Sequence, residues 1–578
     1  MVPVAPSPTP SDVLHRIFGF PEFRGQQEQV VSRVLAGQRT LAIMPTGAGK
    51  SLCYQLPAVI MDGTCIVISP LIALMHDQMR AADAVGIRAA TLTSADDNRA
   101  ETISRFRAGE LDLLYVAPER ASGQEFRNLL RETKIALFAI DEAHCVSEWG
   151  HDFRPDYRLL RPLLDDFAEV PRLALTATAD THTRDDIAEQ LGIPRDGVMV
   201  AGFDRPNIRY AAEAAPNSGI AALVKSLPGA GIVYAQTRDR TEKIAAQIAE
   251  TGRKALYYHA GMEPQTRARA QAEFVSSEDM VMVATVAFGM GIDKPDVRFV
   301  AHLDMPKNIE GYYQETGRAG RDGLPANAWM VYGLQDVVNQ RRMIDTSEVA
   351  SEEFKQVMRG KLDALLTLAE DTHCRRVSLL RYFGEDSQPC MNCDNCLNPP
   401  EVWDGTDAAR KLLSTVYRCH QASGHSFGAA HTMDIVRGKK TDKVAQRGHE
   451  SISTFGVGAE YSEQQLRAVM RQLIAIGALH VHTEEGFSTL HLTEASRAVL
   501  KGDVPVQLRE STSQRSDKKS RSRSAPSPAA ANLGQDAMVR YINLKAWRAE
   551  VAKEHNLPAY VIFHDATLAA IAESAPQS

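Results

Sequence analysis

At 578 residues the chain is too long for one hydrophobic core, so we expect roughly three to five domains. Its hydrophobic content of 44% and charged content of 24% are those of an ordinary globular protein, and no apolar run reaches the about eighteen residues that argue for a membrane span. The net charge of −7 neither indicates nor excludes a nucleic-acid partner, because a basic groove can lie on an acidic protein.

After a Pro-rich lead-in (1–10) without the pattern of a signal peptide, which favours the cytoplasm, short apolar runs alternate with helix-length polar segments. The first stretch (11–203) contains TLAIM (40–44), TCIVIS (64–69), LLYVA (113–117), ALFAI (136–140) and RLALT (172–176). The second (204–340) contains GIVYA (231–235), ALYYH (255–259), VMVAT (281–285), RFVAH (298–302) and AWMVY (328–332). Such runs predict buried parallel strands in βαβ units. We therefore expect two α/β sheets in tandem, with a ligand cleft between them.

The rest of the chain divides into four segments. Residues 341–400 are helical and then rich in cysteine, whereas 401–502 predict helices followed by a hairpin, the pattern of a winged helix. Residues 503–532 hold six Lys or Arg against three acids, a net of +3, among Ser and Pro, which indicates a disordered linker. A short helical segment (533–578) follows. Because no further helices complete it, we expect this segment either to pack poorly or to borrow surface from elsewhere.

A glycine-rich turn, MPTGAGKS (44–51), lies between the first predicted strand and a helix. Gly47 and Gly49 allow backbone N–H groups to approach phosphate oxygens, Lys50 neutralises their charge, and the Ser51 hydroxyl completes a magnesium shell. Met44 stands where the usual P-loop begins with Gly. The alternative is a glycine-rich turn with an incidental lysine.

Two adjacent acids, Asp141 and Glu142 of DEAH (141–144), follow the buried run ALFAI. Ligands bind at this end of the strands in such sheets, so Asp141 can hold Mg²⁺ while Glu142 orients the attacking water. Alone, the string is equally typical of a strand-end cap. Its place after a P-loop favours the nucleotide site.

In the second stretch, QETGRAGR (314–321) sets Arg318 and Arg321 three residues apart beside glycines. Such arginines can reach across a cleft to the γ-phosphate, and we favour Arg321 as the arginine finger with Arg318 as a second contact. A solvated basic turn is the alternative.

Together these three strings resemble those of superfamily-2 helicases, and AHCVSEWGHDFRPDY (143–157) resembles the aromatic-rich loop of the RecQ family. In that family the loop senses single-stranded DNA and couples it to ATP hydrolysis. Trp149, His151, Phe153 and Arg154 match its DNA-contacting residues, whose types suit base stacking and phosphate contact. The alternative, that these are core aromatics, fits poorly with so polar a sequence.

The resemblance implies an α/β fold of two RecA-like domains, a zinc-binding helical subdomain, a winged helix and a truncated helical HRDC-like segment. It also implies ATP and Mg²⁺ as cofactors. Phe20, Arg24 and Gln27 match the adenine motif, where Gly25 replaces the family's Pro. The expected nucleotide-binding residues are therefore Phe20, Arg24, Gln27, Thr46, Gly47, Ala48, Gly49, Lys50, Ser51 and Gln314, with Ser51 and Asp141 on the magnesium ion.

Four cysteines, Cys374, Cys390, Cys393 and Cys396, crowd into one short segment. Thiolates two residues apart can bind one tetrahedral Zn²⁺ from a tight turn, and four of them close a structural site. The setting is similar to the RecQ zinc-binding subdomain, with one residue fewer in the first gap. A redox role for the CxxC pairs is the alternative. The scattered Cys53, Cys65, Cys145 and Cys419 are expected to be buried thiols.

The family resemblance implies an ATP-dependent DNA helicase that moves 3′ to 5′ and unwinds duplex DNA in recombination and repair. Expected partners are single-stranded and forked duplex DNA and a single-stranded-DNA-binding protein, in a cytoplasmic, nucleoid-associated setting. Two rivals stay open: an RNA helicase of the same superfamily, and a DNA-binding or annealing protein that retains a relic motor. The aromatic loop and the cysteines argue against the first, and the intact motor residues argue against the second.

Overall fold

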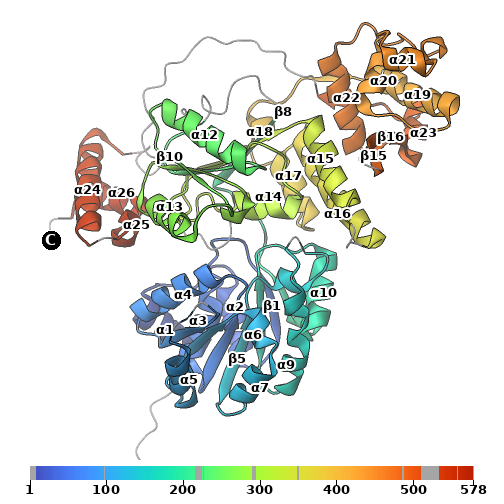
Figure 1. The fold of residues 1–578 in the computed structure, drawn as a ribbon. Coiled ribbons are helices and arrows are strands. Elements are labelled where there is room, and N and C mark those ends of the chain that lie inside the picture. Colours follow the sequence, from blue (N-terminus) through green and yellow to red (C-terminus); the bar gives the residue numbers. More distant parts are fainter. Residues whose placement is uncertain are drawn as a thin grey trace, which may run out of the picture.

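The first parallel sheet, at the base of Figure 1, has seven strands in the order β3-β4-β2-β5-β6-β1-β7. We call this sheet and its helices the first lobe. The computed structural model describes residues 8–576 except 95, 97, 151, 215–223, 225–226, 289–293, 348–350, 485–486, 510–532 and 556. The strands are β1 (Thr40–Ile43), β2 (Thr64–Ile68), β3 (Ala89–Leu92), β4 (Leu113–Val116), β5 (Ile135–Ile140), β6 (Arg172–Thr176) and β7 (Val198–Val200).

Helices on both faces of this sheet explain why β1, β2, β4 and β6 are buried along their whole length. The helices are α1 (Pro10–Val13), α2 (Gln27–Leu35), α3 (Leu52–Ile60), α4 (Ile72–Ala84), α5 (Arg99–Arg107), α6 (Pro118–Ala121), α7 (Gln124–Leu130), α8 (Pro155–Arg158), α9 (Leu160–Asp166) and α10 (Thr181–Leu191). Shorter turns are η1 (Leu14–Phe18), η2 (Ala143–Val146) and η3 (Arg195–Gly197).

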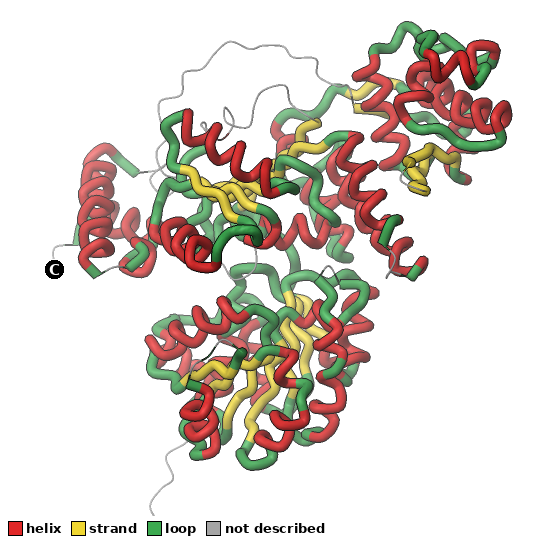
Figure 2. Tube along the Cα trace, viewed as in Figure 1, coloured by secondary structure: helices red, strands yellow, loops and turns green. Residues whose placement is uncertain are grey.

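The second lobe holds a six-stranded parallel sheet in the order β10-β11-β9-β12-β13-β8. Its strands are β8 (Ile208–Ala214), β9 (Gly231–Tyr234), β10 (Ala255–Tyr258), β11 (Val281–Ala284), β12 (Phe299–His302) and β13 (Ala326–Tyr332). The helical elements are α12 (Arg238–Glu250), α13 (Pro264–Ser276), η4 (Val286–Phe288) and α14 (Ile309–Thr316). Figure 2 shows loops, in green, where the two lobes meet. The prediction of two tandem parallel sheets is confirmed.

The predicted zinc-binding subdomain comprises α15 (Leu334–Asp345), α16 (Glu352–Glu370), α17 (Arg375–Tyr382) and α18 (Asp394–Leu397). Helix α16 is capped by Ser351, whose hydroxyl accepts the Phe354 N–H. Helix α15 crosses residue 340, the predicted border of the second α/β stretch. The helix thus continues across that border, and its buried Arg341 makes an ion pair with Asp363 of α16, which joins the two helices.

The winged-helix unit follows the predicted order of helices and hairpin. It contains β14 (Val402–Asp404), α19 (Thr406–Ser423), α20 (Ala429–Val436), α21 (Asp442–Gln446), η5 (His449–Ser451), α22 (Glu463–Ala475), β15 (Leu479–Glu484), β16 (Phe487–Leu492), α23 (Glu494–Lys501) and β17 (Gln507–Arg509). Strand β17 pairs with β14, so the start of the predicted linker (503–532) belongs to this unit. The buried side chains of Val506 and Leu508 explain the difference.

The C-terminal segment forms α24 (Gln535–Glu554), α25 (Ala559–Ile562) and α26 (Asp565–Ser574). Its own core is small: Leu568, Ala569 and Ala572 of α26 pack on Tyr541 of α24. It also docks beside α13 of the second lobe (Figure 1), where Glu278 accepts Arg548 at 2.7 Å and Lys545 at 3.0 Å. Of the two expectations, poor packing or packing against another part of the chain, the structure shows the second.

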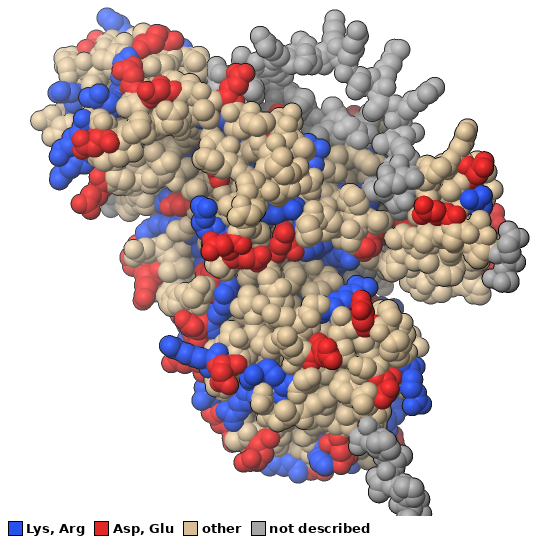
Figure 3. Space-filling view, turned by 180° about the vertical axis from the view of Figure 1, so that it is seen from behind, with Lys and Arg blue, Asp and Glu red and all other residues tan. Residues whose placement is uncertain are grey.

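Charge is distributed without a dominant sign on the face shown in Figure 3, where Lys and Arg lie interspersed with Asp and Glu. The net charge is accordingly a poor guide to binding surfaces. Within the described part of the chain, no helix combines the length and apolar character needed to cross a bilayer.

Candidate active site at the seam of the two lobes

A cleft of about 650 Å³ lies between the lobes and is lined from both sides. The first lobe contributes the P-loop and the DEAH acids, and the second contributes α14 and the loop after it. Of the predicted site residues, the lining contains Phe20, Arg24, Thr46, Gly47, Gly49, Lys50, Ser51, Asp141, Glu142, Gln314, Arg318 and Arg321. The three strings singled out in the sequence therefore meet in one place.

The P-loop runs from the end of β1 to the start of α3. Gly47 and Gly49 have φ angles of +87° and +71°, a backbone conformation that glycine adopts without strain. The Gln27 side-chain amide donates to the Ala48 carbonyl at 2.8 Å and links the P-loop to α2. Gln27 and Ala48 thus shape the P-loop from behind, and the cleft lining does not include them.

Lys50 is the cation of the P-loop, and its Nζ lies 3.4 Å from the Met44 carbonyl oxygen. Burial lowers the pKa of Lys50, while the charges of Glu142 and Asp141 oppose that shift. The lysine is thus held between the loop and two acids, where the phosphates of a nucleotide can replace lost hydration.

Asp141 and Glu142 follow β5 at the carboxyl end of the first sheet. Burial, reinforced by the neighbouring charge of Glu142, raises the pKa of Asp141 to about 7. His144 lies 3.4 Å from Glu142 and its Nδ1 lies 2.9 Å from the Thr176 hydroxyl. His144 thereby connects the acids to the last residue of β6.

Arg205, in the connection between the lobes, holds the arginine loop against the P-loop. Its Nη1 donates to the Thr46 carbonyl at 2.7 Å and to the Gly317 carbonyl at 3.0 Å. Its Nη2 donates to Ala319 at 2.9 Å and to Gly320 at 3.0 Å. One guanidinium therefore binds backbone on both sides of the seam.

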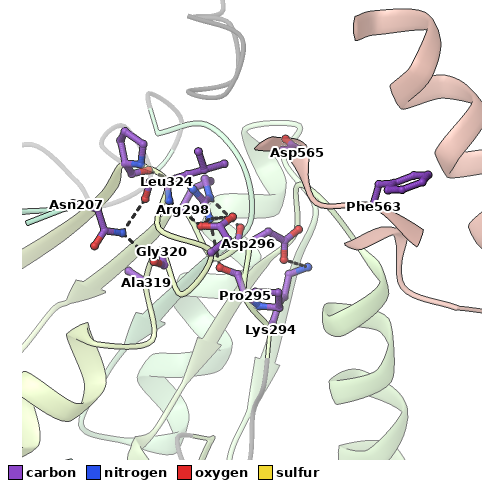
Figure 4. A network of polar contacts seen from close by, with 12 residues as sticks. Asn207, Lys294, Pro295, Asp296, Arg298, Ala319, Gly320, Leu324, Phe563 and Asp565 are labelled. Atoms are coloured by element: carbon purple, nitrogen blue, oxygen red, sulfur yellow. Dashed lines mark hydrogen bonds and ion pairs between the residues drawn. The ribbon is translucent and has the colours of Figure 1, made fainter. Parts of the chain in front are cut away.

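The loop that follows Arg321 is braced from within the second lobe (Figure 4). Arg298 donates to both carboxylate oxygens of Asp322, at 2.7 and 2.6 Å. Asn207 donates to the carbonyls of Gly320 and Leu324 at 2.8 and 2.9 Å. Sequence reasoning missed Arg205, Arg298 and Asn207, because most of their partners are backbone carbonyls that leave no mark in residue spacing.

The aromatic loop follows DEAH and lies on the first lobe. The Trp149 ring stacks on His182 of α10 with centroids 5.2 Å apart, and the Arg158 guanidinium lies over the Phe153 ring at 5.7 Å. Arg154 donates to the Pro70 carbonyl at 2.9 Å. Trp149, Phe153 and Arg154 are half-buried, whereas the predicted His151 lies outside the described residues.

This loop packs tightly on the DEAH segment. A Cβ added at Gly150 would overlap the His144 carbonyl oxygen, so only glycine fits there. Asp152 of the same loop lines the cleft. The loop therefore connects the DEAH segment with the lining of the cleft.

Phe20 and Arg24 reach the cleft from the segment before α2, and the Phe20 side chain is 44% exposed. Three residues of the C-terminal segment, His564, Ala566 and Thr567, also line the cleft. The sequence carried no sign of their position, because it depends on the docking of that segment on the second lobe.

The four predicted cysteines come together. The Sγ atoms of Cys374, Cys390, Cys393 and Cys396 lie within 4.8 Å of one another. The backbone N–H of Cys390 donates to Cys374 Sγ at 3.2 Å, and that of Cys393 donates to Cys390 Sγ at 3.2 Å, bonds that favour thiolates. Four sulfurs at this spacing fit a tetrahedral Zn²⁺. The other four cysteines are buried, as predicted.

Comparison with known protein families matches five successive parts of the chain. Models match for DEAD/DEAH box helicases (24–187), the helicase conserved C-terminal domain (218–323), RecQ zinc-binding (334–397), the RQC domain (399–517) and the HRDC domain (538–578). The "ATP-dependent DNA helicase RecQ" of Haemophilus influenzae is 42% identical over 99% of this chain and 91% of its own length.

The chain belongs to the RecQ family of ATP-dependent DNA helicases. The corresponding RecQ proteins of Pasteurella multocida and Bacillus subtilis are 41% and 36% identical, over 98% and 96% of this chain and 89% and 91% of their own lengths. The RecQ zinc-binding match coincides with the cysteine cluster, which is the zinc site of this family member. The RQC and HRDC matches cover the winged helix and the C-terminal segment.

Proposed function

We propose that this RecQ helicase uses ATP and Mg²⁺ to move 3′ to 5′ along single-stranded DNA and to separate duplex DNA, in recombination and repair. The observation that carries the proposal is the meeting of Lys50 with Arg318 and Arg321 in one cleft between two sheets. A nucleotide bound there joins the lobes, and its hydrolysis releases them.

Each side chain has a proposed role. Lys50 and the P-loop amides bind the β- and γ-phosphates, and Glu142 orients the attacking water. Arg321 stabilises charge on the γ-phosphate, with Arg318 and Gln314 beside it. Ser51 and Asp141 would hold the magnesium ion, which supplies positive charge to the phosphates when bound.

The adenine base is proposed to lie against Phe20 and Arg24, which line the same cleft. Gln27 belongs to the same motif, and its bond to the Ala48 carbonyl supports a second role in shaping the P-loop. Both roles place the adenine motif next to the phosphates.

The aromatic loop is proposed as the sensor of single-stranded DNA. Trp149, His151 and Phe153 provide aromatic faces for bases, and Arg154 contacts phosphate or stacks. Because Gly150 packs on His144, a strand that displaces this loop alters the surroundings of the DEAH acids. Binding should weaken as salt rises, since contacts to the DNA backbone release counterions.

Forked duplex DNA is the proposed substrate, and a single-stranded-DNA-binding protein is a proposed partner because unwinding produces the strand that such a protein coats. Association with chromosomal DNA would follow from the same substrate. Family membership argues against the RNA-helicase alternative.

A strand-separation assay on tailed duplexes tests the proposal. With ATP and Mg²⁺, a duplex with a 3′ single-stranded tail should be unwound, and one with a 5′ tail should stay intact. Omitting ATP or adding a chelator should abolish separation. Unwinding of the 5′-tailed duplex alone would contradict the proposed polarity, and unwinding without ATP would contradict the motor.

A further inference from the structure

The ammonium group of Lys361 is buried where three parts of the molecule meet. Lys361 lies on α16, which packs beside α14 of the second lobe (Figure 1). Its Nζ lies 2.5 Å from the Trp149 carbonyl oxygen, 2.7 Å from Glu310 Oε2 and 3.4 Å from Asp180 Oδ2. Only 4% of the Lys361 side chain and 1% of the Glu310 side chain are exposed.

The three contacts match the three donors of an ammonium group. The Tyr382 hydroxyl lies 3.4 Å from Asp180 Oδ2 and 3.5 Å from Glu310 Oε1, so both carboxylates share a second polar neighbour. Burial raises the pKa of Glu310 to about 7, although the charge of Lys361 opposes the shift. Removing one member of such a buried charge cluster destabilises the fold, because no water replaces the contact that the remaining charged groups lose.

Each of the three residues that contact the Lys361 ammonium group belongs to a different functional element. Trp149 belongs to the aromatic loop. Asp180 caps α10 by accepting the Thr183 N–H at 2.7 Å, and it follows the Thr176–Thr178 segment that contacts His144. Glu310 is in the first turn of α14, the helix that runs into the loop of Arg318 and Arg321.

We propose that Lys361 is a positioning residue that transmits the state of the aromatic loop to both lobes of the motor. Single-stranded DNA moves the loop backbone at Trp149, and this movement changes the contacts of the ammonium group with Glu310 and Asp180. The arginine loop then closes on the nucleotide. This inference rests on the proposed role of the aromatic loop as the DNA sensor.

The test compares ATP hydrolysis with and without single-stranded DNA in the full chain. Lys361→Met removes the positive charge. The double variant Lys361→Met/Glu310→Gln also removes the Glu310 carboxylate, which would otherwise stay buried without its cation, and this second change protects folding. Lys355→Met is the matched control, because Lys355 lies on the same helix and its Nζ binds only the Asp345 carbonyl among the contacts described. Lys361→Arg keeps the positive charge.

The proposal predicts that both Met variants hydrolyse ATP without DNA within about twofold of the wild type, while stimulation by DNA falls roughly tenfold or more. Affinity for single-stranded DNA should change by less than about threefold, because the Lys361 side chain is buried and offers the strand almost no surface. Lys361→Arg should recover part of the stimulation, and Lys355→Met should keep all of it.

Trp149→Ala, measured in parallel, separates the two proposals. If Trp149→Ala loses stimulation while the Lys361 variants keep it, the inference on Lys361 is wrong and the sensor role of the loop stands. If Trp149→Ala keeps full stimulation, the sensor role itself fails. An equal loss of basal and stimulated hydrolysis in the Lys361 variants would assign the residue a purely structural role and overturn the inference.

Discussion

Arg321 of the second lobe lies directly over Gly47 of the P-loop. A Cβ built on Gly47 would be 3.5 Å from Arg321 Cγ, and the φ angle of Gly47 is +87°. Two loops from different lobes therefore touch at the P-loop end of the cleft. A cation from each lobe, Lys50 and Arg321, lines the same space.

Lys50→Ala should abolish ATP hydrolysis without unfolding the chain. The lysine is the only P-loop cation within MPTGAGKS, and the helix after it is held by its own buried side chains. Phosphate release measures the loss, and an unchanged melting temperature with retained DNA binding shows that the fold survives. Turnover close to that of the wild type would refute the P-loop assignment.

Arg205→Ala should slow hydrolysis with little effect on nucleotide affinity. The variant removes the four bonds that hold the arginine loop against Thr46, and misplacement of catalytic groups slows the chemical step. We expect kcat to fall roughly tenfold to a hundredfold and KM to change by less than about threefold. The exposed Arg195 offers a control, Arg195→Ala, that should behave as the wild type. A rise in KM with an unaltered kcat would show that Arg205 acts in binding instead.

Cys393→Ser should release the structural zinc and loosen the second lobe. Residues next to the cluster hold β8, since Arg375 donates to the Ala212 carbonyl at 3.3 Å and to Asp394 at 2.6 Å. Metal analysis should give about one zinc ion per chain in the wild type and much less in the variant. Cys419→Ser, which changes a buried cysteine outside the cluster, should keep its zinc. Full zinc content in Cys393→Ser would contradict the four-cysteine site.

The winged helix should become less stable in mild acid because of one histidine pair. His431 Nε2 lies 2.8 Å from His449 Nδ1, and burial, followed by the charge of His449, lowers the pKa of His431 to about 4. Lys443 and Arg447 lower the same pKa, and Asp434 opposes them. The unfolded chain takes up the proton near pH 6.5, so stability present above that pH is lost as pH falls towards 4.

His431→Gln removes this titration while keeping a polar side chain. Its melting temperature should fall less between about pH 7.5 and pH 5 than that of the wild type. Calorimetry at a series of pH values makes the comparison. Parallel curves for the two proteins would show that His431 binds its proton equally well in the folded and the unfolded chain, and would contradict the prediction.

The motif residues that line the cleft could be predicted from the sequence because phosphate chemistry requires fixed residue types at short spacing. Lys50, Asp141 and Arg321 each lie within a motif of four to eight residues, and the neighbouring residues of each motif are expected to act on the same nucleotide. The cysteine cluster could be predicted for the same reason, because two overlapping pairs, each with two residues between its cysteines, suit one metal ion.

The residues that join the lobes could not be predicted in this way. Arg205 and Thr46 are 159 residues apart, and Lys361 and Trp149 are 212 apart. In both cases the acceptor is a backbone carbonyl, which any residue type provides. Only the packing of the lobes and of α16 brings these groups together.

Three of the four strands at the ends of the two sheets were also missed, whereas the fourth, β10, lies within the predicted run ALYYH (255–259). The apolar runs do not include β3, β7 or β8, and each of these lies at one end of its sheet. β7 is only half-buried, and β8 alternates buried with exposed positions. Central strands, covered on both faces, give continuous apolar runs instead.

Phosphate release by Arg321→Ala, measured together with ATP binding, tests most directly whether nucleotide chemistry occurs at the seam of the lobes. With Arg195→Ala as control, the account predicts that Arg321→Ala binds ATP within about threefold of the wild type and that its DNA-stimulated kcat falls by roughly a thousandfold. A variant that hydrolyses ATP at nearly the wild-type rate would show that the second lobe takes no part in the reaction, and would contradict the account.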